Sequence, residues 1–399
     1  MINFLVFTIA IILLPFSIYS QDDTLQKKTD SSQIDIRYYL VKKGWIKKIT
    51  YNDKFLFLIP VIGANPANGF IYGGGLAYIY KSKGSVRFST ISTNASYSTK
   101  NLGNFNIRSN LFKMKDKLFL NGDWGYFIIK EKTYGLGGNP NSPAQSLGYD
   151  HLRFHEIALW EFFTNFFAGV GIHYDHYFNS VGDTLVTGSS NASYDYLYST
   201  EHGFDLKGNT ISGLSLNLLF DNRDNPVNSY KGCYANVNFR VNGTAYGSSK
   251  NSTMLLADYR SFYSLDAENR HILAFWLYGN FVVNGDVPYL SLPALGYDQR
   301  QRTGRGYAFG YLRGEDLLYA ESEYRFSISP KTNILGGVIF ANFTSVSNRE
   351  NNIALLKNIW GAGGAGLRIM IDKQSRTRLD FDAAFGNKIG LYVAVRETF

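Results

Sequence analysis

Acidic and basic side chains are concentrated in one stretch of the sequence, from Leu295 to Ile328. The stretch opens with a glycine-rich, basic loop around Arg305-Gly306-Tyr307. A segment of strict alternation follows, with Leu318, Ala320, Ser322, Tyr324 and Phe326 on one face and Tyr319, Glu321, Glu323, Arg325 and Ser327 on the other. A period of two residues predicts a β-strand with one apolar face and one polar, charged face.

The two glutamates of this strand need a cationic partner if the polar face is enclosed. In a membrane barrel the apolar face contacts lipid and the polar face lines the lumen. A carboxylate buried there is costly unless a cation pairs with it. The upstream loop carries four arginines, Arg300, Arg302, Arg305 and Arg313. We expect the loop to fold back into the lumen and Arg305 to pair with one of these two carboxylates, Glu321 or Glu323. The other interpretation is an ordinary solvated pair of lumen side chains.

A second group of reactive residues has a simpler explanation. The run His173-Tyr174-Asp175-His176 contains the residue types of a metal site or of an Asp–His dyad. On a strand, however, His173 and His176 face opposite sides, which favours histidines at the membrane interface near a strand end. No serine with a matching acid and histidine stands out. We therefore predict no catalytic residues.

Metals, cofactors and nucleic acids are not expected as ligands. Cys233 is the only cysteine, so neither an intrachain disulfide nor a Cys-based metal site can form. The glycine-rich run 361–366 lacks the following helix that a phosphate loop requires. The lysines and arginines form no array with aromatic residues of the kind that binds nucleic acid.

The composition is typical of a barrel whose apolar residues are dispersed by alternation. Of the 399 residues 16% are aromatic and 18% charged, with 39 glycines and 9 prolines. Soluble domains usually carry about 25% charged residues, although a large soluble β-protein remains compatible with these values. After residue 20 no apolar run approaches the ~20 residues of a spanning helix. The net charge of +8 favours contact with anionic lipid head groups or lipopolysaccharide.

Charged residues at inward-facing positions decide between a soluble sandwich and a membrane barrel. In RTRLDFDAAFG, one face carries Leu379, Phe381, Ala383 and Phe385, and the other Arg378, Asp380 and Asp382. A dry protein core does not tolerate such charges. Runs of about ten residues also match a tilted strand that crosses the bilayer. We therefore predict an all-β, transmembrane, antiparallel barrel.

About sixteen strands are expected. Five follow the Arg305 loop, near residues 317–327, 332–343, 358–371, 376–386 and 389–398, and about eleven precede it, beginning near Phe70. This count places the long loop at 131–149 on the periplasmic side, where turns are usually short, so one early strand is suspect. The other long loops are predicted around 179–192 and 284–313.

The chain divides into three predicted parts. Residues 1–20 have the short apolar core of a secretory signal peptide, with a retained N-terminal anchor as the alternative. Residues 21–53 form a periplasmic leader, either structureless or including a short amphipathic helix around Trp45. Residues 54–399 form the barrel. Its last strand ends on Phe399, with Leu391, Val393 and Val395 on the same register, a pattern typical of an outer-membrane assembly signal.

One turn between predicted strands is unusually rich in polar residues. The segment from Asp221 to Asn225, with Arg223 and Asp224, precedes Pro226 and Gly232. Asp and Asn side chains stabilise turns by bonding to the nearby backbone, and Pro and Gly fit a connection between strands. We interpret Asp221, Arg223, Asp224, Pro226 and Gly232 as structural.

Three motifs together resemble the BamA/TamA superfamily, which includes the bacterial surface antigen family. The Gly304-Arg305-Gly306-Tyr307 loop, followed by Gly310, Gly314 and Glu323-Tyr324-Arg325, resembles that superfamily's inward-folding lid loop and next strand. The segment Asp221–Pro226 with Gly232 is similar to its D-x-R-D…P…G signature, and Ile59–Gly75 to its barrel entry. With Phe399, these motifs cover the chain from about residue 55 to its end.

The resemblance implies a sixteen-stranded barrel in which Glu323 of the wall holds Arg305 of the lid loop. In the family, the following strand carries a second acid. The matching position in this chain is Asn342, so the acid for a second ionic anchor of the lid loop is missing. Relatives that insert or secrete proteins carry periplasmic POTRA domains of several dozen residues. Residues 21–53 leave no room for one, so a protein-assembly activity is not carried over.

The expected protein is a non-enzymatic barrel of the bacterial outer membrane, with a role in envelope assembly or as a plugged channel. Its expected partners are outer-membrane lipid, lipopolysaccharide, the barrel-assembly machinery for its own insertion, and other envelope proteins. A barrel enzyme (a phospholipase or protease) and a passive porin are the alternatives.

Overall fold

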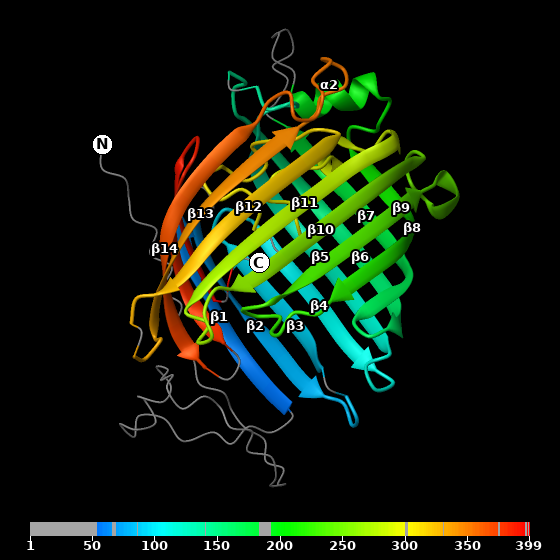
Figure 1. Ribbon diagram of the computed structural model, residues 1–399. Coiled ribbons are helices and arrows are strands. Elements are labelled where there is room, and N and C mark those ends of the chain that lie inside the picture. Colours follow the sequence, from blue (N-terminus) through cyan, green and yellow to red (C-terminus); the bar gives the residue numbers. More distant parts are fainter. Residues whose placement is uncertain are drawn as a thin grey trace.

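A computed structural model describes residues 54–65, 69–85, 87–139, 141–182, 193–299, 302–329, 331–373, 376–395, 397 and 399. The signal peptide and leader predicted for residues 1–53 lie outside this range, as does Arg300. Sixteen strands form one sheet in which each strand pairs with its neighbour in sequence (Figure 1). The predicted all-β architecture with sixteen antiparallel strands is confirmed.

The strands are β1 (Lys54–Asn65), β2 (Gly69–Lys81), β3 (Phe88–Ser98), β4 (Gly103–Lys113), β5 (Leu118–Thr133), β6 (Gln145–Phe163), β7 (Phe166–Gly182), β8 (Gly208–Asp221), β9 (Gly232–Asn242), β10 (Ser252–Ser264), β11 (His271–Gly285), β12 (Asp316–Ser327), β13 (Leu335–Val346), β14 (Trp360–Asp372), β15 (Thr377–Phe385) and β16 (Ile389–Val395). In the described connections lie three short helices, α2 (Tyr194–Glu201), η1 (Thr244–Tyr246) and η2 (Tyr289–Ser291). Within the described residues, no helix has both the length and the apolar character required to cross a membrane.

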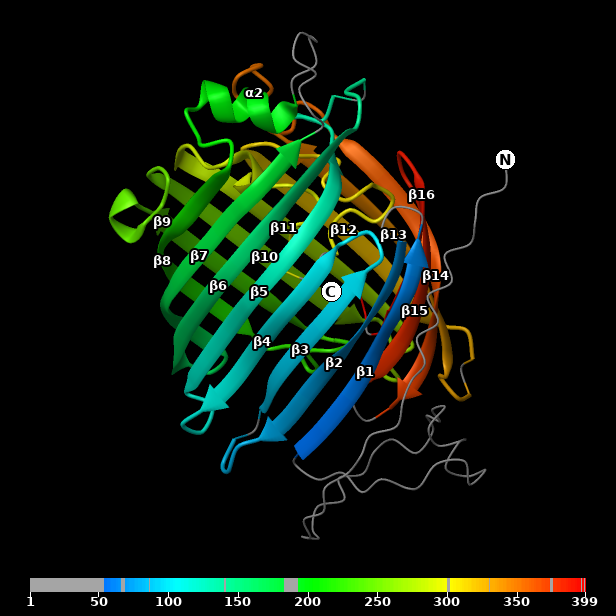
Figure 2. The same ribbon diagram turned by 180° about the vertical axis from the view of Figure 1, so that it is seen from behind.

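The sheet curls into a barrel-shaped wall, and β1 and β16 approach each other on the same side of the molecule (Figures 1 and 2). Among the described residues, no strand pairing joins these two strands. The first strand begins at Lys54, so the predicted start near Phe70 is wrong by one strand. This strand moves the long β5–β6 connection, residues 134–144, to the same end as the other long loops.

Side-chain exposure alternates along the strands with the apolar residues outside. Leu216 of β8 is 64% exposed and Phe381 of β15 is 40% exposed, whereas Asn217 and Asp382 are buried. On β12 the inward face carries Tyr319, Glu321, Glu323 and Arg325, all buried. A polar interior with an apolar exterior is the arrangement of a transmembrane barrel and the reverse of a soluble sandwich.

The two ends of the barrel differ in the length of their connections. One end has short turns, such as residues 164–165 between β6 and β7, and is therefore the periplasmic end. The opposite end carries the long connections and α2, which lies across the top of the barrel in Figure 1. The longest described connection, residues 286–315 between β11 and β12, is the lid loop.

The end of the chain lies inside the barrel, since Phe399 is buried against side chains of the inner face, and the C-terminal label falls within the outline of the barrel in Figures 1 and 2. Leu391 and Val393 of β16 face outward, but β16 ends at Val395, and Glu397 and Phe399 are buried. The predicted common register of Phe399 with Leu391 and Val393 is therefore wrong. Phe399 instead packs in the lumen, with its ring centroid 5.3 Å from that of Trp276.

Candidate functional site

The lid loop is shaped by local polar contacts and by glycines. The Asp298 carboxylate accepts hydrogen bonds from the backbone N–H of Arg302 at 2.9 Å and of Thr303 at 2.7 Å. Gly304 and Gly306 flank Arg305 with φ of +89° and +97°, a conformation that disfavours residues with a Cβ. A Cβ on Gly306 would also lie 2.8 Å from the Cβ of Ala362. These constraints present the Arg305 side chain to the barrel wall.

Arg305 is enclosed by carboxylates from two different strands. Its Nη2 donates to Glu321 Oε1 at 2.6 Å and also to Glu323 on β12. Its Nη1 donates to Asp382 Oδ2 of β15 at 2.8 Å. The guanidinium carbon lies 3.5 Å from the centroid of the Phe340 ring, and the side chain is 4% exposed. The structure thus brings Arg305 together with both glutamates considered from the sequence, and adds Asp382.

Further hydrogen bonds fix the backbone of the lid loop beside Arg305. Asn342 of β13 donates to the Arg305 carbonyl at 3.0 Å. The Gly306 N–H donates to the Tyr392 hydroxyl at 2.9 Å, and the Tyr307 hydroxyl donates to the Gly361 carbonyl at 2.6 Å. Asn342 therefore holds the loop through its side-chain amide. The acid of a second ionic anchor, which the resemblance places at position 342, is supplied here by Asp382.

The carboxylates around Arg305 continue into a larger buried network. Arg368 of β14 donates to Asp382 at 2.5 Å and to Glu397 at 2.8 Å. Arg325 donates to Glu323 at 2.7 Å and to the Phe399 carbonyl at 3.3 Å. Alternating charges of this kind compensate one another, whereas an isolated buried charge would be expensive. The end of the chain is thus connected to the lid-loop site.

Arg313 forms a second anchor for the lid loop that the sequence did not indicate. Its side chain is completely buried and donates to the Tyr289 carbonyl at 2.9 Å and to the Tyr297 hydroxyl at 3.0 Å. Glu131 of β5 lies 3.5 Å from Nη2 and also accepts a hydrogen bond from Tyr297. Because Glu131 lies 182 positions away in sequence, local patterns carried no signal for this contact.

The polar turn between β8 and β9 has the contacts expected of a structural motif. Arg223 donates to Asp221 through Nε at 2.8 Å and Nη2 at 2.7 Å, and Asp224 accepts from the Tyr230 N–H at 3.0 Å. Pro226 lies within this turn, and Gly232 has φ of +98°. A Cβ at Gly232 would approach the Asn222 carbonyl oxygen to 2.6 Å.

The same turn also contacts a distant part of the periplasmic end. Arg376, in the β14–β15 turn, donates to Asp224 at 2.6 Å, and its guanidinium carbon lies 4.1 Å from the centroid of the Tyr230 ring. Strands β9 and β14 are five steps apart in the sheet, which corresponds to roughly 24 Å along the wall. The β8–β9 turn therefore crosses the opening at this end.

The histidines of β6 and β7 form a separate polar cluster in the lumen. His155 lies 2.7 Å and His151 3.0 Å from the Asp175 carboxylate, and Arg240 donates to Asp175 at 3.2 Å. His173 is buried in the middle of β7, so the expectation of an interface residue near a strand end is wrong for it. His173 and His176 do face opposite sides.

This cluster contains a Ser–His contact but not a triad. His173 Nε2 lies 2.7 Å from Ser215 Oγ, while His173 Nδ1 has no hydrogen-bond partner. A nucleophilic serine needs a base oriented by a third group and access for a substrate. Asp175 binds the other two histidines, and Ser215 is buried. Among the described residues, no group of three or more His, Cys, Asp or Glu side chains could hold a metal ion.

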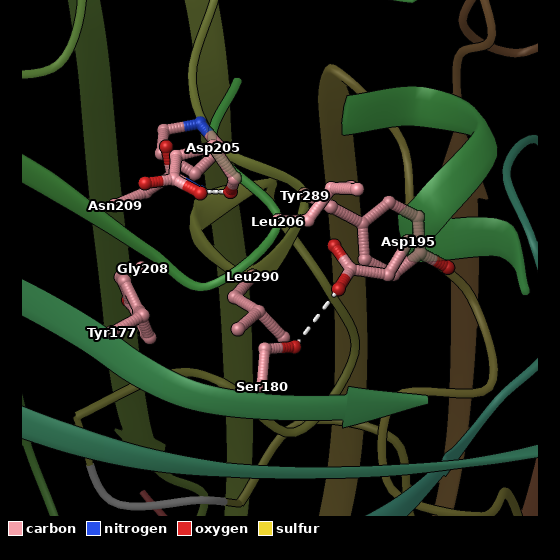
Figure 3. A pocket seen from close by; sticks show the side chains of 10 residues that line it. Tyr177, Ser180, Asp195, Asp205, Leu206, Gly208, Asn209, Tyr289 and Leu290 are labelled. Carbon is pink, nitrogen blue, oxygen red and sulfur yellow. Dashed lines mark hydrogen bonds between the residues drawn. The ribbon is translucent and has the colours of Figure 1, made fainter. Parts of the chain in front are cut away.

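The end opposite the periplasm is covered by α2 and η2. Tyr198 of α2 donates to the Val287 carbonyl at 3.1 Å and stacks on His202, with ring centroids 4.0 Å apart. Figure 3 shows a pocket here, with Ser180 directed at Asp195 of α2 at 3.0 Å. Its free volume of about 10 Å³ suits one water molecule at most. Burial raises the pKa of the Asp195 carboxyl above its ordinary value.

An apolar outer surface, a charged lumen and an internally anchored loop define an outer-membrane β-barrel with an inward-folded loop. The sequence matches the model of the Omp85 superfamily domain over residues 173–390, and the chain belongs to this superfamily. It is located in the bacterial outer membrane. No curated protein sequence matches the chain significantly.

Solved structures show the same fold at low sequence identity. BamA from Haemophilus ducreyi lacking POTRA domains 1–3 is similar with a TM-score of 0.57 and 14% identity, covering 86% of this chain and 69% of that one. CdiB from Acinetobacter baumannii has a TM-score of 0.52 and 13% identity, covering 84% of this chain and 56% of that one. CdiB from Escherichia coli has a TM-score of 0.52 and 11% identity, with coverages of 87% and 61%. The chain thus spans less than two thirds of either CdiB chain.

Proposed function

We propose that this protein is a non-enzymatic, plugged barrel of the outer membrane that acts in envelope assembly, and that release of the lid loop opens its lumen. The observation that carries the proposal is the burial of Arg305 among Glu321, Glu323 and Asp382. Three carboxylates from two strands hold one guanidinium at 4% exposure. Losing the cation would leave Glu321 buried without its described ion pair, while Glu323 and Asp382 would keep only Arg325 and Arg368, which favours a closed resting state.

The lid loop has the features of a latch. It is attached to the wall at two places, by Arg305 and by Arg313, and both attachments are ionic. Charge-assisted, multidentate hydrogen bonds are strong and geometrically demanding. Such contacts hold one position of a loop firmly, yet they can be exchanged for other ionic partners without loss of apolar packing. We propose that a client or partner of the envelope supplies these alternative contacts.

The proposal extends to the parts outside the described residues. We propose that residues 1–20 direct export and are removed near Ser20/Gln21, and that residues 21–53 remain as a periplasmic leader. Mass spectrometry of the protein from outer membranes gives the mature N-terminus directly. A mass that retains residues 1–20 would contradict this part of the proposal alone.

Conductance in planar bilayers tests the plugged state. We expect the wild-type protein to show small, unstable currents and Arg305→Ala to show larger and longer openings. Arg260→Ala is the matched control, because Arg260 is also a buried lumen arginine but donates its described hydrogen bonds to Asp258 of its own strand, at 2.9 and 2.6 Å. Large, stable currents from the wild type would support a passive porin instead. Equal currents from the two variants would mean that release of the lid loop does not open the lumen.

A further inference from the structure

A cavity remains between the lid loop and the last two strands of the barrel. Its volume is about 140 Å³, and it is lined by lid-loop residues from Gly296 to Phe309 and by residues of β15 and β16. Since one water needs about 10–15 Å³ measured in this way, the cavity has room for a small organic molecule or several waters. It lies beside the Arg305 contacts but is not filled by them.

Asp380 of β15 lines this cavity, and its carboxylate receives no hydrogen bond. Its side chain is 3% exposed, and neither carboxylate oxygen accepts a hydrogen bond. Arg368 Nε lies 3.3 Å from Oδ1 but is directed at Glu397, to which it donates at 2.8 Å. A buried carboxylate in this condition costs free energy unless a cation or a proton reaches it.

The ion pairs around Asp380 also contain more carboxylates than arginines. Four arginines of this network, Arg305, Arg325, Arg368 and Arg378, form ion pairs with five carboxylates, Glu321, Glu323, Asp380, Asp382 and Glu397. Within these ion pairs the carboxylates outnumber the arginines by one, and Arg302, which lines the same cavity, forms none of the described pairs. Asp380 and Asp382 both line the cavity, and Asp380 is the one of the two that accepts no hydrogen bond.

We propose that this cavity binds a small organic cation, an alkylammonium or guanidinium group, through Asp380. Asp380 supplies the charge, and Tyr307, Phe309 and Tyr392, which also line the cavity, supply aromatic surface for the cation and its alkyl stem. A divalent metal ion is a poor alternative because it requires several oxygen ligands, and no such group of side chains occurs in the described parts of the chain.

Two sources could provide this chemistry. One is a free amine, and the other is the side chain of a lysine or arginine on a polypeptide that reaches the lid loop. Arg302 also lines the cavity, and none of the described ion pairs involves its side chain. Its charge opposes the entry of a second cation and gives the test an internal control.

The test uses the full-length protein in detergent, in a buffer free of amines, with n-butylammonium as the probe and n-butanol as its neutral analogue. We expect n-butylammonium to raise the midpoint of thermal unfolding in a concentration-dependent manner and n-butanol to have no such effect. Asp380→Asn should weaken n-butylammonium binding at least tenfold in calorimetry. The matched control Asp258→Asn removes a lumen carboxylate that already has its arginine and should keep the binding.

Three results would overturn the proposal: no effect of n-butylammonium on the wild type, an equal effect on Asp380→Asn, or weaker binding to Arg302→Gln. Removing the Arg302 charge should instead strengthen cation binding, and this variant keeps Asp380 intact. A second probe, Nα-acetyl-lysine amide, separates the sources. Binding of both probes indicates that a polypeptide side chain can enter, and binding of n-butylammonium alone indicates a site for free amines.

Discussion

Arg305 of the lid loop and Asp382 of β15 meet at 2.8 Å although 77 positions separate them in the sequence. Asp382 also binds Arg368, which in turn binds Glu397 near the end of the chain. The position of the lid loop, the wall at β14–β15 and the end of the chain are thus coupled through one carboxylate. A substitution at any of these three places should therefore affect the structure at the other two.

Arg305→Ala should destabilise the closed lid loop by about 3–5 kcal/mol, because three buried carboxylates lose their shared cation. The midpoint temperature of heat-modifiable gel mobility should fall, and the lid loop should become sensitive to proteases. Arg305→Lys should be intermediate, since lysine keeps the charge but loses the planar fork. Unchanged mobility and protease resistance in Arg305→Ala would contradict the role of Arg305 as a latch.

Gly306→Ala should open the lid loop without changing any charge. Alanine at a φ of +97° is strained, typically by 1–3 kcal/mol, and its Cβ would lie 2.8 Å from that of Ala362. Gly247→Ala provides the control, because Gly247 has a similar φ of +86° but no atom within 4 Å of the added Cβ. We expect proteolysis of the lid loop in the first variant only. Equal sensitivity in both would mean that the close approach to Ala362 is unimportant.

Phe399→Ala should destabilise the barrel by about 3–5 kcal/mol, since the ring is buried against Trp276 and Phe262. Phe385→Ala is the control, because Phe385 is 59% exposed to the lipid side. The measurements are surface abundance and the thermal midpoint of the purified protein. Low abundance with a normal midpoint would assign Phe399 to recognition during assembly, as predicted from the sequence, and not to packing.

The packing of α2 should weaken as the pH rises. Because burial raises the pKa of Asp195, the folded protein binds this proton more readily than the unfolded chain. The contribution to stability is therefore present at low pH and is lost as the pH rises from the ordinary carboxyl value near 4 through the raised value. Hydrogen exchange of residues 194–201 should be slower at pH 5 than at pH 8 after correction for the intrinsic rate.

Asp195→Asn should remove this difference in hydrogen exchange, because the side chain no longer titrates. Asp205→Asn should retain it, since Asp205 is exposed and outside the helix. A pH difference of the same size in the Asp195→Asn protein would assign the effect to another group.

Alternation was sufficient to predict the wall but not its first strand. On β12 and β15 the predicted faces and boundaries agree with the structure to within two residues, because every second residue is charged or polar. In KFLFLIPVIGAN, by contrast, apolar residues occur on both faces and Pro60 interrupts the run, so the period of two is obscured. The predicted total of about sixteen strands nevertheless agrees with the sixteen found.

The candidate site was only partly accessible to sequence reasoning. Arg305 and the glutamates of β12 are 16 and 18 positions apart, and the alternation showed which acids face the lumen. Asp382 was assigned to the inward face as well, but nothing local related it to Arg305. The inward turn after Val395 was missed, because the apolar register of β16 continues formally to Phe399.

The crossing of the periplasmic opening by the β8–β9 turn has a consequence for transport. The lid loop and this turn lie at different depths along the barrel axis, and each has its own ionic attachment, at Arg305 and at Arg376. If the lumen opens as proposed, an ion or polypeptide that moves along the axis would have to pass both attachments. Release of the lid loop alone would then leave the β8–β9 turn in the path.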